Sequence, residues 1–233
     1  WVGRTGGRID PRSCGYEVRA LPERAARIEY EHITPAWSFG HQRQCWQNGG
    51  RKNCVATDPV FRAMEADAHN LTVVVGEVNA DRSHYNYAQL SKTPYQYGAC
   101  ATRVDFNQRA AEPRDEAKGL VARVQLYMHD WYGLRMSRQQ QQLFTAWDRM
   151  YPPSDWELER DRRIAKVMGH SNPYVTGERT WTVGQQPSGD GLATPGVATH
   201  PFQGKNSRSI SQHSQMTGAT AGSVIGNRNS HVY

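Results

Sequence analysis

A change of composition near residue 176 limits how large a core this chain of 233 residues can build. The segment that follows is rich in Gly, Ser, Thr, Gln and Asn and has few large apolar residues, as in GQQPSGDGLATPGVATHPFQGKNSRS. Such a segment cannot bury enough apolar surface to offset the conformational entropy that it would lose on folding. We therefore predict one folded domain over residues 1–175 and a flexible, low-complexity tail over residues 176–233.

The second half of the predicted domain has the pattern of three helices. The segment EPRDEAKGLVARVQLYMHDWYG begins with acidic residues, carries an apolar stripe and ends at Gly133, as a helix with a glycine stop does. Two later segments start with a serine followed three residues on by Gln or Glu, which is the spacing of a capping box. These serines are Ser137 and Ser154, and Gly169 closes the second segment.

The first half mixes short strands with short helices. ARIEYEHI alternates and contains β-type residues, NLTVVV is a second strand candidate, and GEVNADRSHY has the pattern of a short helix. Asp58-Pro59 is a typical helix start. Helices combined with a few short strands predict an α+β domain.

The chain is basic, with a formal net charge of +6 and a pI of about 9.3. This charge favours a polyanionic partner, with nucleic acid ahead of an anionic membrane surface, although it can also serve only to keep the chain in solution. No apolar run approaches the ~20 residues that a membrane helix needs. We therefore expect a nucleic-acid partner and no membrane partner.

The four cysteines form an even set without a CxxC spacing: Cys14, Cys45, Cys54 and Cys100. This usage indicates two disulfides and an oxidising compartment. Three pairings are open, and we favour Cys14–Cys45 with Cys54–Cys100, which would clamp both ends of the Arg51 loop. A structural zinc site at His41, Cys45 and Cys54 is the alternative, although the spacing matches none of the common zinc patterns.

The dipeptide Glu31-His32 carries the residue types that phosphodiester hydrolysis requires. A histidine can deprotonate water near neutral pH, and a carboxylate can hold Mg²⁺ at a phosphate, together with an amide oxygen such as that of Asn79. Neighbours on a regular strand point to opposite faces, so the strand must end or bulge here for both to serve one site. Pro35 favours such an end. Taken alone, a histidine at a strand end is more often structural.

Several basic side chains are candidates for contacts with phosphates. Arg51 lies in the glycine-flanked stretch GGRKN, and an arginine can hold a phosphate with its bidentate fork. Arg82 lies at helical spacing from Asn79, and the last predicted helix carries further basic residues that could follow a phosphate backbone. These last candidates are Arg160, Arg163 and Lys166. Solvated charges, paired on the last helix with nearby acidic residues, are the alternative interpretation.

Read together, the motifs are far more specific. The run RIEYEHITPAWSFGHQRQCWQNGGRKNC, followed by DPVFRAMEADAHNLT, GEVNADRS and WELERDRRIAKVMGHSNPYV, closely resembles the bacterial endonuclease I family over about residues 8–175. These are periplasmic or secreted non-specific nucleases of the ββα-metal, or His-Me finger, type. The resemblance implies a β-hairpin around Glu31-His32, with the helix that bears Asn79 packed across it.

The resemblance also implies a role for each matched residue. His32 stands at the general base, Glu31 and Asn79 at the ligands of one Mg²⁺ ion, for which Mn²⁺ or Ca²⁺ can substitute, and Arg51 at the arginine that holds the phosphate. Asn70 stands at the asparagine that would orient the histidine. The expected protein is a monomeric endonuclease, periplasmic or secreted, that cuts DNA and also RNA without sequence preference and leaves 5′-phosphate ends. The alternative is a catalytically weak nucleic-acid-binding protein on the same scaffold.

Overall fold

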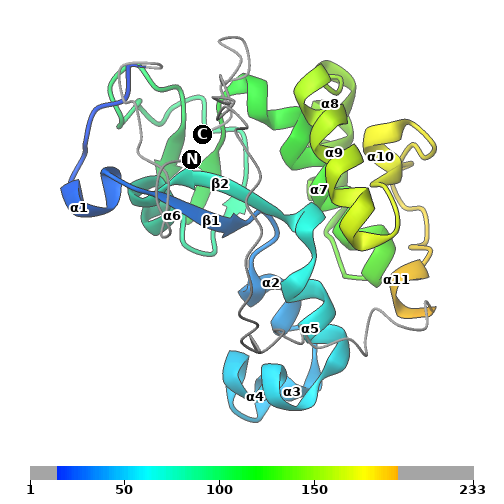
Figure 1. The fold of residues 1–233 in the computed structure, drawn as a ribbon. Coiled ribbons are helices and arrows are strands. Elements are labelled where there is room, and N and C mark those ends of the chain that lie inside the picture. Colours follow the sequence, from blue (N-terminus) through cyan, green and yellow to red (C-terminus); the bar gives the residue numbers. More distant parts are fainter. Residues whose placement is uncertain (1–14, 194–233) are drawn as a thin grey trace, which may run out of the picture.

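The computed structural model describes residues 15–193 and has the predicted α+β fold (Figure 1). A hairpin of β1 (Ile28–His32) and β2 (Leu71–Val75) lies between a lobe of short helices and a layer of longer ones. Between residues 15 and 193, no helix has the length and apolar character needed to cross a bilayer.

The hairpin and the helix that follows it form the ββα unit that the resemblance implies. β1 and β2 are antiparallel, with Glu31 opposite Thr72 and His32 opposite Leu71. Helix α6 (Gly76–Arg82) follows β2 directly and packs on both strands, while the single turn α1 (Pro22–Ala25) packs on α6. β1 ends at His32, and Pro35 is the N-cap of the next helix, so the strand ends at this pair, as the nearby proline favours.

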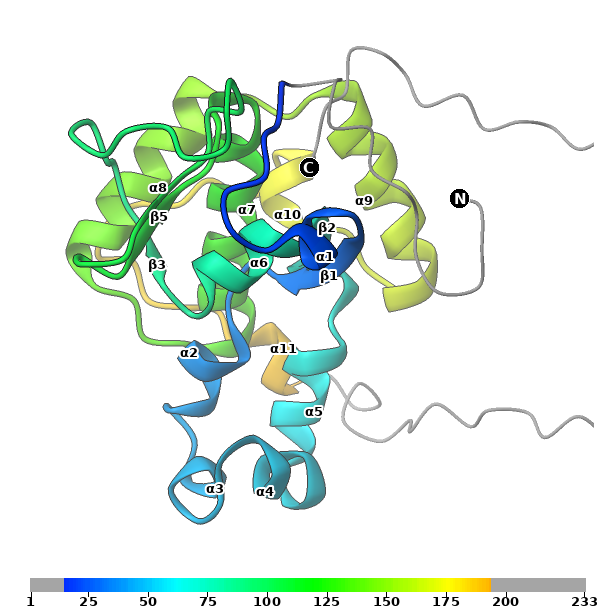
Figure 2. The same ribbon diagram turned by 90° about the vertical axis from the view of Figure 1, so that its left-hand side faces the viewer.

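A helical lobe is inserted between the two strands of the hairpin (Figure 2). Its elements are the helices α2 (Ala36–Gly40), α3 (Gln44–Gln47), α4 (Gly50–Thr57) and α5 (Pro59–Ala66), and one turn of 3-10 helix, η2 (Ala68–Asn70). The predicted start of α5 is confirmed, because the Asp58 side chain accepts hydrogen bonds from the backbone N–H groups of Val60 and Phe61.

The disulfide in this lobe corrects the predicted pairing. Cys45 of α3 bonds to Cys54 of α4, with their Cα atoms 4.9 Å apart. Gly49 and Gly50 make this possible, because both adopt positive φ angles and so form the tight turn between the two helices. The bond leaves neither sulfur available to a zinc ion at His41. Cys100 is buried and has no disulfide partner among residues 15–193, whereas Cys14 lies outside the described residues.

The longer helices pack beside the hairpin. They are α7 (Asp115–Tyr132), α8 (Arg138–Met150) and α9 (Asp155–Met168), and the single turn α10 (Pro173–Thr176) packs on α7 and α9. α7 is largely buried and packs mainly on α8. The predicted serine caps of α8 and α9 are confirmed, since each serine side chain accepts a hydrogen bond from the backbone three residues on. Gly133 and Gly169 end α7 and α9 in the left-handed conformation.

A second sheet completes the described body, in the order β3-β5-β4. Its strands are very short: β3 (Asn86–Tyr87), β4 (Arg103–Asp105) and β5 (Ala110–Glu112). β3 is parallel to β5, and β4 is antiparallel to it. Strands of two or three residues leave too little alternation in the sequence to be predicted.

The folded body extends beyond the boundary predicted at residue 175. Trp181 is fully buried, and Arg179 lies 2.7 Å from Asp130 of α7 and 2.6 Å from Asp190, the first residue of α11 (Asp190–Ala193). One tryptophan and one pair of ion contacts therefore fix a segment whose average composition is that of a linker. The rest of the predicted tail lies outside the described residues.

Candidate active site

His32 stands half-buried at the end of β1, with its ring fixed by two neighbours. Its Nε2 atom lies 2.8 Å from the backbone carbonyl oxygen of Glu65, and its ring packs edge-on against Phe39 at 6.2 Å between centroids. A carbonyl oxygen only accepts hydrogen bonds, so Nε2 carries the proton and Nδ1 of the neutral ring is left as an acceptor. Burial lowers the pKa of His32, and the hydrogen bond to Glu65 offsets only part of that effect. The neutral form, which can take up a proton, is therefore favoured near neutral pH.

Glu65 joins His32 to Arg51. Its backbone oxygen accepts a hydrogen bond from Nε2 of His32, and its side-chain Oε1 accepts one from Nε of Arg51 at 2.5 Å. The Arg51 side chain is 58% exposed and belongs to the first turn of α4 rather than to a loop. Its terminal nitrogens can therefore meet a phosphate from solvent. Glu65 was not among the predicted site residues, because its position in α5 gives no sign of a partner on β1.

The prediction that Asn70 orients the histidine needs correction. Asn70 is fully buried, and its side chain accepts from Thr34 N at 2.7 Å and donates to Thr34 O at 3.0 Å. Its backbone oxygen accepts from Ile33 N at 2.9 Å. Asn70 thus fixes the backbone just after His32, whereas the group that hydrogen-bonds the His32 ring is the Glu65 carbonyl.

Glu31 lies on the opposite face of β1 and is buried against α6. Its Oε1 atom lies 2.6 Å from Nη1 of Arg82. Nη1 also donates to the backbone oxygen of His32, and Nη2 donates to that of Ile33. Burial raises the pKa of Glu31, and the charge of Arg82 offsets part of that rise. Arg82 is only 3% exposed. The prediction that Arg82 binds nucleic acid is therefore wrong, since its guanidinium is used inside the protein.

Asn79 lies on α6, one helical turn before Arg82, and contacts the same face of β1. Its Nδ2 atom donates to Oε2 of Glu29 at 2.9 Å, and Glu29 also accepts hydrogen bonds from Arg24 and Arg27. Burial alone would raise the pKa of Glu29, but the hydrogen bonds from Arg24, Asn79 and Arg27 outweigh it and lower this pKa to about 2. Glu29 was not among the predicted site residues, although its place two residues before Glu31 sets it on the same strand face.

The candidate site therefore has two halves, one on each side of β1. His32, Glu65 and Arg51 form one half, and Glu31 and Asn79 the other. Among the described residues, no side chain of one half hydrogen-bonds a side chain of the other, and Arg82 links them through Glu31 Oε1 and the backbone oxygen of His32. The oxygens Glu31 Oε2 and Asn79 Oδ1 accept no hydrogen bond from another residue of the described range. One carboxylate oxygen and one amide oxygen suit a hard divalent cation that keeps several water ligands. Within residues 15–193, no group of three or more His, Cys, Asp or Glu residues is placed to hold a metal.

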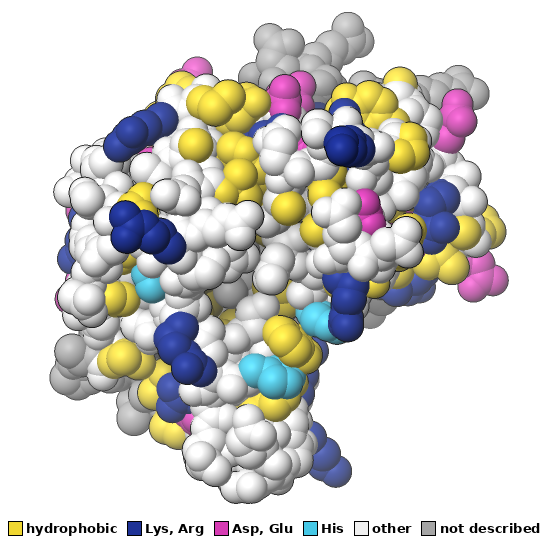
Figure 3. All heavy atoms as spheres, turned by 180° about the vertical axis from the view of Figure 1, so that it is seen from behind, with side chains coloured by type: hydrophobic (Ala, Val, Ile, Leu, Met, Phe, Trp, Pro, Cys, Tyr) yellow, Lys and Arg dark blue, Asp and Glu magenta, His cyan; other side chains and the backbone are white. Residues whose placement is uncertain are grey.

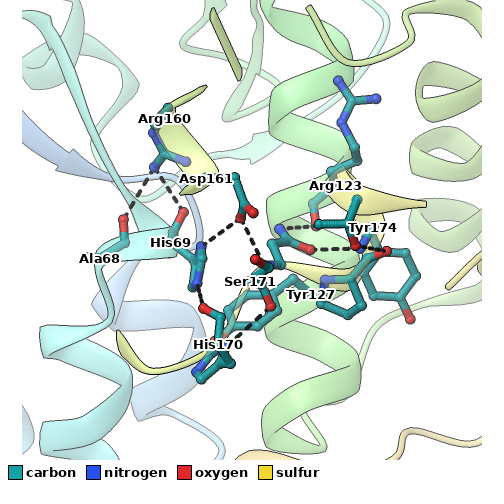
Figure 4. Close-up of polar contacts among 12 residues, drawn as sticks. Ala68, His69, Arg123, Tyr127, Arg160, Asp161, His170, Ser171 and Tyr174 are labelled. Carbon is teal, nitrogen blue, oxygen red and sulfur yellow. Dashed lines mark hydrogen bonds and ion pairs between the residues drawn. The ribbon is translucent and has the colours of Figure 1, made fainter. Parts of the chain in front are cut away.

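The basic residues predicted on the last helix fall into two kinds. Nη2 of Arg160 donates to the backbone oxygens of Ala68 and His69, at 3.2 and 3.1 Å (Figure 4). It also donates to that of Leu71 at 2.6 Å. Arg160 thus ties α9 to the segment before β2, and this nitrogen is used within the protein rather than on a phosphate. Arg163 is 74% exposed and pairs with Glu159 of its own helix, and Lys166 is also exposed. Of these three residues, Arg163 and Lys166 are exposed, whereas Arg160 is half-buried.

A histidine cluster supports the same junction between α9 and η2. His69 is fully buried, and its ring lies 3.0 Å from the backbone oxygen of His170 and 3.4 Å from Asp161 (Figure 4). Asp67, also buried, accepts hydrogen bonds from Tyr127 and Tyr132 of α7. These contacts fix the start of β2, which pairs with the end of β1 at His32.

Lys and Arg side chains are scattered over the face seen from behind, and do not gather into one patch (Figure 3). Scattered cations attract a polyanion from many directions but give no aligned row of base-reading groups.

Comparison with known proteins gives one consistent result. The family model described as Endonuclease I matches residues 7–178. An extracellular deoxyribonuclease and a periplasmic deoxyribonuclease of Aeromonas hydrophila are each 52% identical over 167 residues, which cover 71% of this chain and 73% and 70% of those proteins. Endonuclease-1 of Buchnera aphidicola subsp. Acyrthosiphon pisum is 44% identical over 163 residues, which cover 70% of this chain and 65% of that protein.

Proposed function

The chain belongs to the endonuclease I family. We therefore propose that it hydrolyses phosphodiester bonds of DNA and of RNA, with its active site at the end of β1. It is an endonuclease of the periplasm or the extracellular space. In this proposal the enzyme acts as a monomer, without sequence preference, and leaves 5′-phosphate ends.

The proposed general base is Nδ1 of His32. The Glu65 carbonyl holds the Nε2 proton, so the ring accepts the proton of the attacking water without changing tautomer. This contact is the observation that carries the proposal, because it fixes the tautomer in which Nδ1 is free to accept a proton. A positioned general base typically accelerates such a step by about 10²–10⁴-fold.

The proposed cation ligands are the Glu31 carboxylate and the Asn79 amide oxygen. Mg²⁺ suits these hard oxygen donors, and Mn²⁺ or Ca²⁺ can take its place. When bound, the ion would offset the negative charge that develops on the phosphate. Arg82 would keep Glu31 in a fixed orientation, since it holds one carboxylate oxygen and leaves the other for the ion.

Arg51 would hold the scissile phosphate from the opposite half of the site. The Glu65 carboxylate contacts only its Nε atom, so its terminal nitrogens can donate to phosphate oxygens. Exposed Arg163 and Lys166 would add phosphate contacts on α9 that carry no sequence information.

Cleavage of supercoiled plasmid tests this function directly. We expect nicking and linearisation with Mg²⁺ or Mn²⁺, no cleavage in excess chelator, and ends that a ligase rejoins because they carry 5′-phosphates. Full activity in excess chelator would exclude the proposed cation role. A shift of plasmid mobility without any cleavage would instead indicate a nucleic-acid-binding protein on the same scaffold.

A further inference from the structure

The hydrogen bond between Glu29 and Asn79 has no role yet in the proposed chemistry. Asn79 Nδ2 donates to Glu29 Oε2 at 2.9 Å across 50 residues of sequence. We propose that Glu29 is a positioning residue, which fixes the Asn79 amide so that its oxygen, rather than its nitrogen, is presented to the divalent cation. This inference rests on the proposed role of Asn79 as a ligand.

The chemistry of the two groups makes the contact directional. An ionised carboxylate only accepts hydrogen bonds, whereas an amide has one donor end and one acceptor end. Asn79 must therefore turn its nitrogen towards Glu29, which leaves Oδ1 on the other side. Without this partner the terminal torsion of an asparagine is broad and roughly two-fold, so nitrogen and oxygen would exchange places. Only the oxygen can bind a cation.

Glu29 is itself held in place from two sides. Arg24 donates from Nε to Oε1 at 3.0 Å and from Nη2 to Oε2, and Arg27 donates to Oε1 at 2.9 Å. The first residue of α6 allows this close approach, because a Cβ atom on Gly76 would lie 2.8 Å from Oε1 of Glu29. The carboxylate that orients Asn79 therefore has little freedom to move.

The geometry of the hairpin repeats the same arrangement at the second ligand. Glu29 and Glu31 share one face of β1, about 6–7 Å apart along the strand, while Asn79 and Arg82 lie one turn apart on α6. Glu29 contacts Asn79, and Arg82 contacts Glu31. Each proposed ligand thus has one atom held by a charged neighbour and one oxygen left over. Partners of this kind orient metal ligands, and their loss typically lowers metal affinity about 10–100-fold.

Binding of Mn²⁺ to the full chain, measured by electron paramagnetic resonance without nucleic acid, tests the inference. We expect Glu29→Ala to raise the Kd for Mn²⁺ about 10–100-fold, and Glu29→Gln, which keeps the size but can offer either end of its amide, to raise it by a smaller factor. The control is Glu23→Gln, which removes the same charge from an exposed position on nearby α1 and should change Kd less than about threefold, as surface charge acts weakly. Thermal unfolding shows whether each variant is folded.

A double-mutant cycle separates positioning from a general effect of charge or packing. Asn79→Ala should weaken Mn²⁺ binding, and adding Glu29→Ala to it should cost nothing further, because the residue acts only through Asn79. Full additivity of the two losses, or wild-type affinity in Glu29→Ala, would overturn the inference while leaving the ligand role of Asn79 intact. Unchanged Mn²⁺ affinity in Asn79→Ala would instead refute the proposed ligand itself.

Discussion

Replacing Arg82 with methionine distinguishes the structure from the sequence-based interpretation most clearly. The Arg82 guanidinium donates to Glu31 at 2.6 Å, to His32 O at 2.9 Å and to Ile33 O at 2.6 Å, in a site where Arg82 is only 3% exposed. Methionine keeps most of the apolar stem but leaves the Glu31 carboxylate buried without its counterion. Breaking a buried ion pair by removing one partner typically costs about 3–5 kcal/mol. That is a large part of the roughly 5–15 kcal/mol by which domains are stable.

The assay is denaturant unfolding of wild-type protein and the Arg82→Met variant, with Arg163→Met as the matched control. Arg163 is 74% exposed and pairs only with a neighbour on its own helix, so its loss should change stability by less than about 0.5 kcal/mol. We expect Arg82→Met to lower the unfolding midpoint in proportion to about 3–5 kcal/mol. A loss below about 1 kcal/mol, combined with weaker DNA binding, would refute this account and restore Arg82 to the surface role.

Three further results are expected. Reducing the Cys45–Cys54 bond, or replacing both residues with alanine, should destabilise the protein by about 2.7 kcal/mol in the chain-entropy model for a loop of this length, and equal denaturation curves with and without reductant would contradict this. Burial alone would raise the pKa of Glu77, but hydrogen bonds from Tyr16 and three backbone N–H groups lower it. The stabilisation by the Glu77 carboxylate is therefore present above its ordinary pKa near 4.5 and is lost as pH falls through the lowered pKa. Glu77→Gln should flatten the acid limb of a curve of stability against pH, and an unchanged limb would exclude this contribution. Cleavage should fall steeply with salt while sequenced ends of partial digests stay diverse, and a dominant motif of four or more base pairs would indicate a site-specific enzyme.

Local signals in the sequence were sufficient for the elements that depend on neighbours along the chain. The serine caps of α8 and α9, the glycine ends of α7 and α9, and the end of β1 before Pro35 all require only a few adjacent residues. The two strands were visible too, β1 from its alternation and β2 from its short run of β-branched residues, but not their pairing. The motif resemblance then supplied the ββα arrangement.

The errors concern residues whose partners lie far along the chain. Arg82 has the spacing of an exposed helical residue, but it is buried by the packing of α6 on β1 and by the Tyr87 ring, whose centroid lies 4.6 Å from the guanidinium carbon. Glu29 and Glu65 meet partners 50 and 33 residues away, and no periodicity indicates which side chains will meet after folding. The disulfide was mispredicted because the turn at Gly49 and Gly50 is tighter than the loop that the pairing assumed.

Cleavage by the His32→Ala variant tests the central claim most directly. Single-turnover rates with saturating Mg²⁺ and DNA should fall by at least about 100-fold, because a general base contributes about 10²–10⁴-fold. The Kd for DNA should stay close to that of wild type, since a base adds rate rather than ground-state affinity. Added imidazole should restore part of the lost rate by supplying the missing acceptor. A variant that keeps more than about a tenth of the wild-type rate without imidazole would contradict the assignment of His32 as the general base.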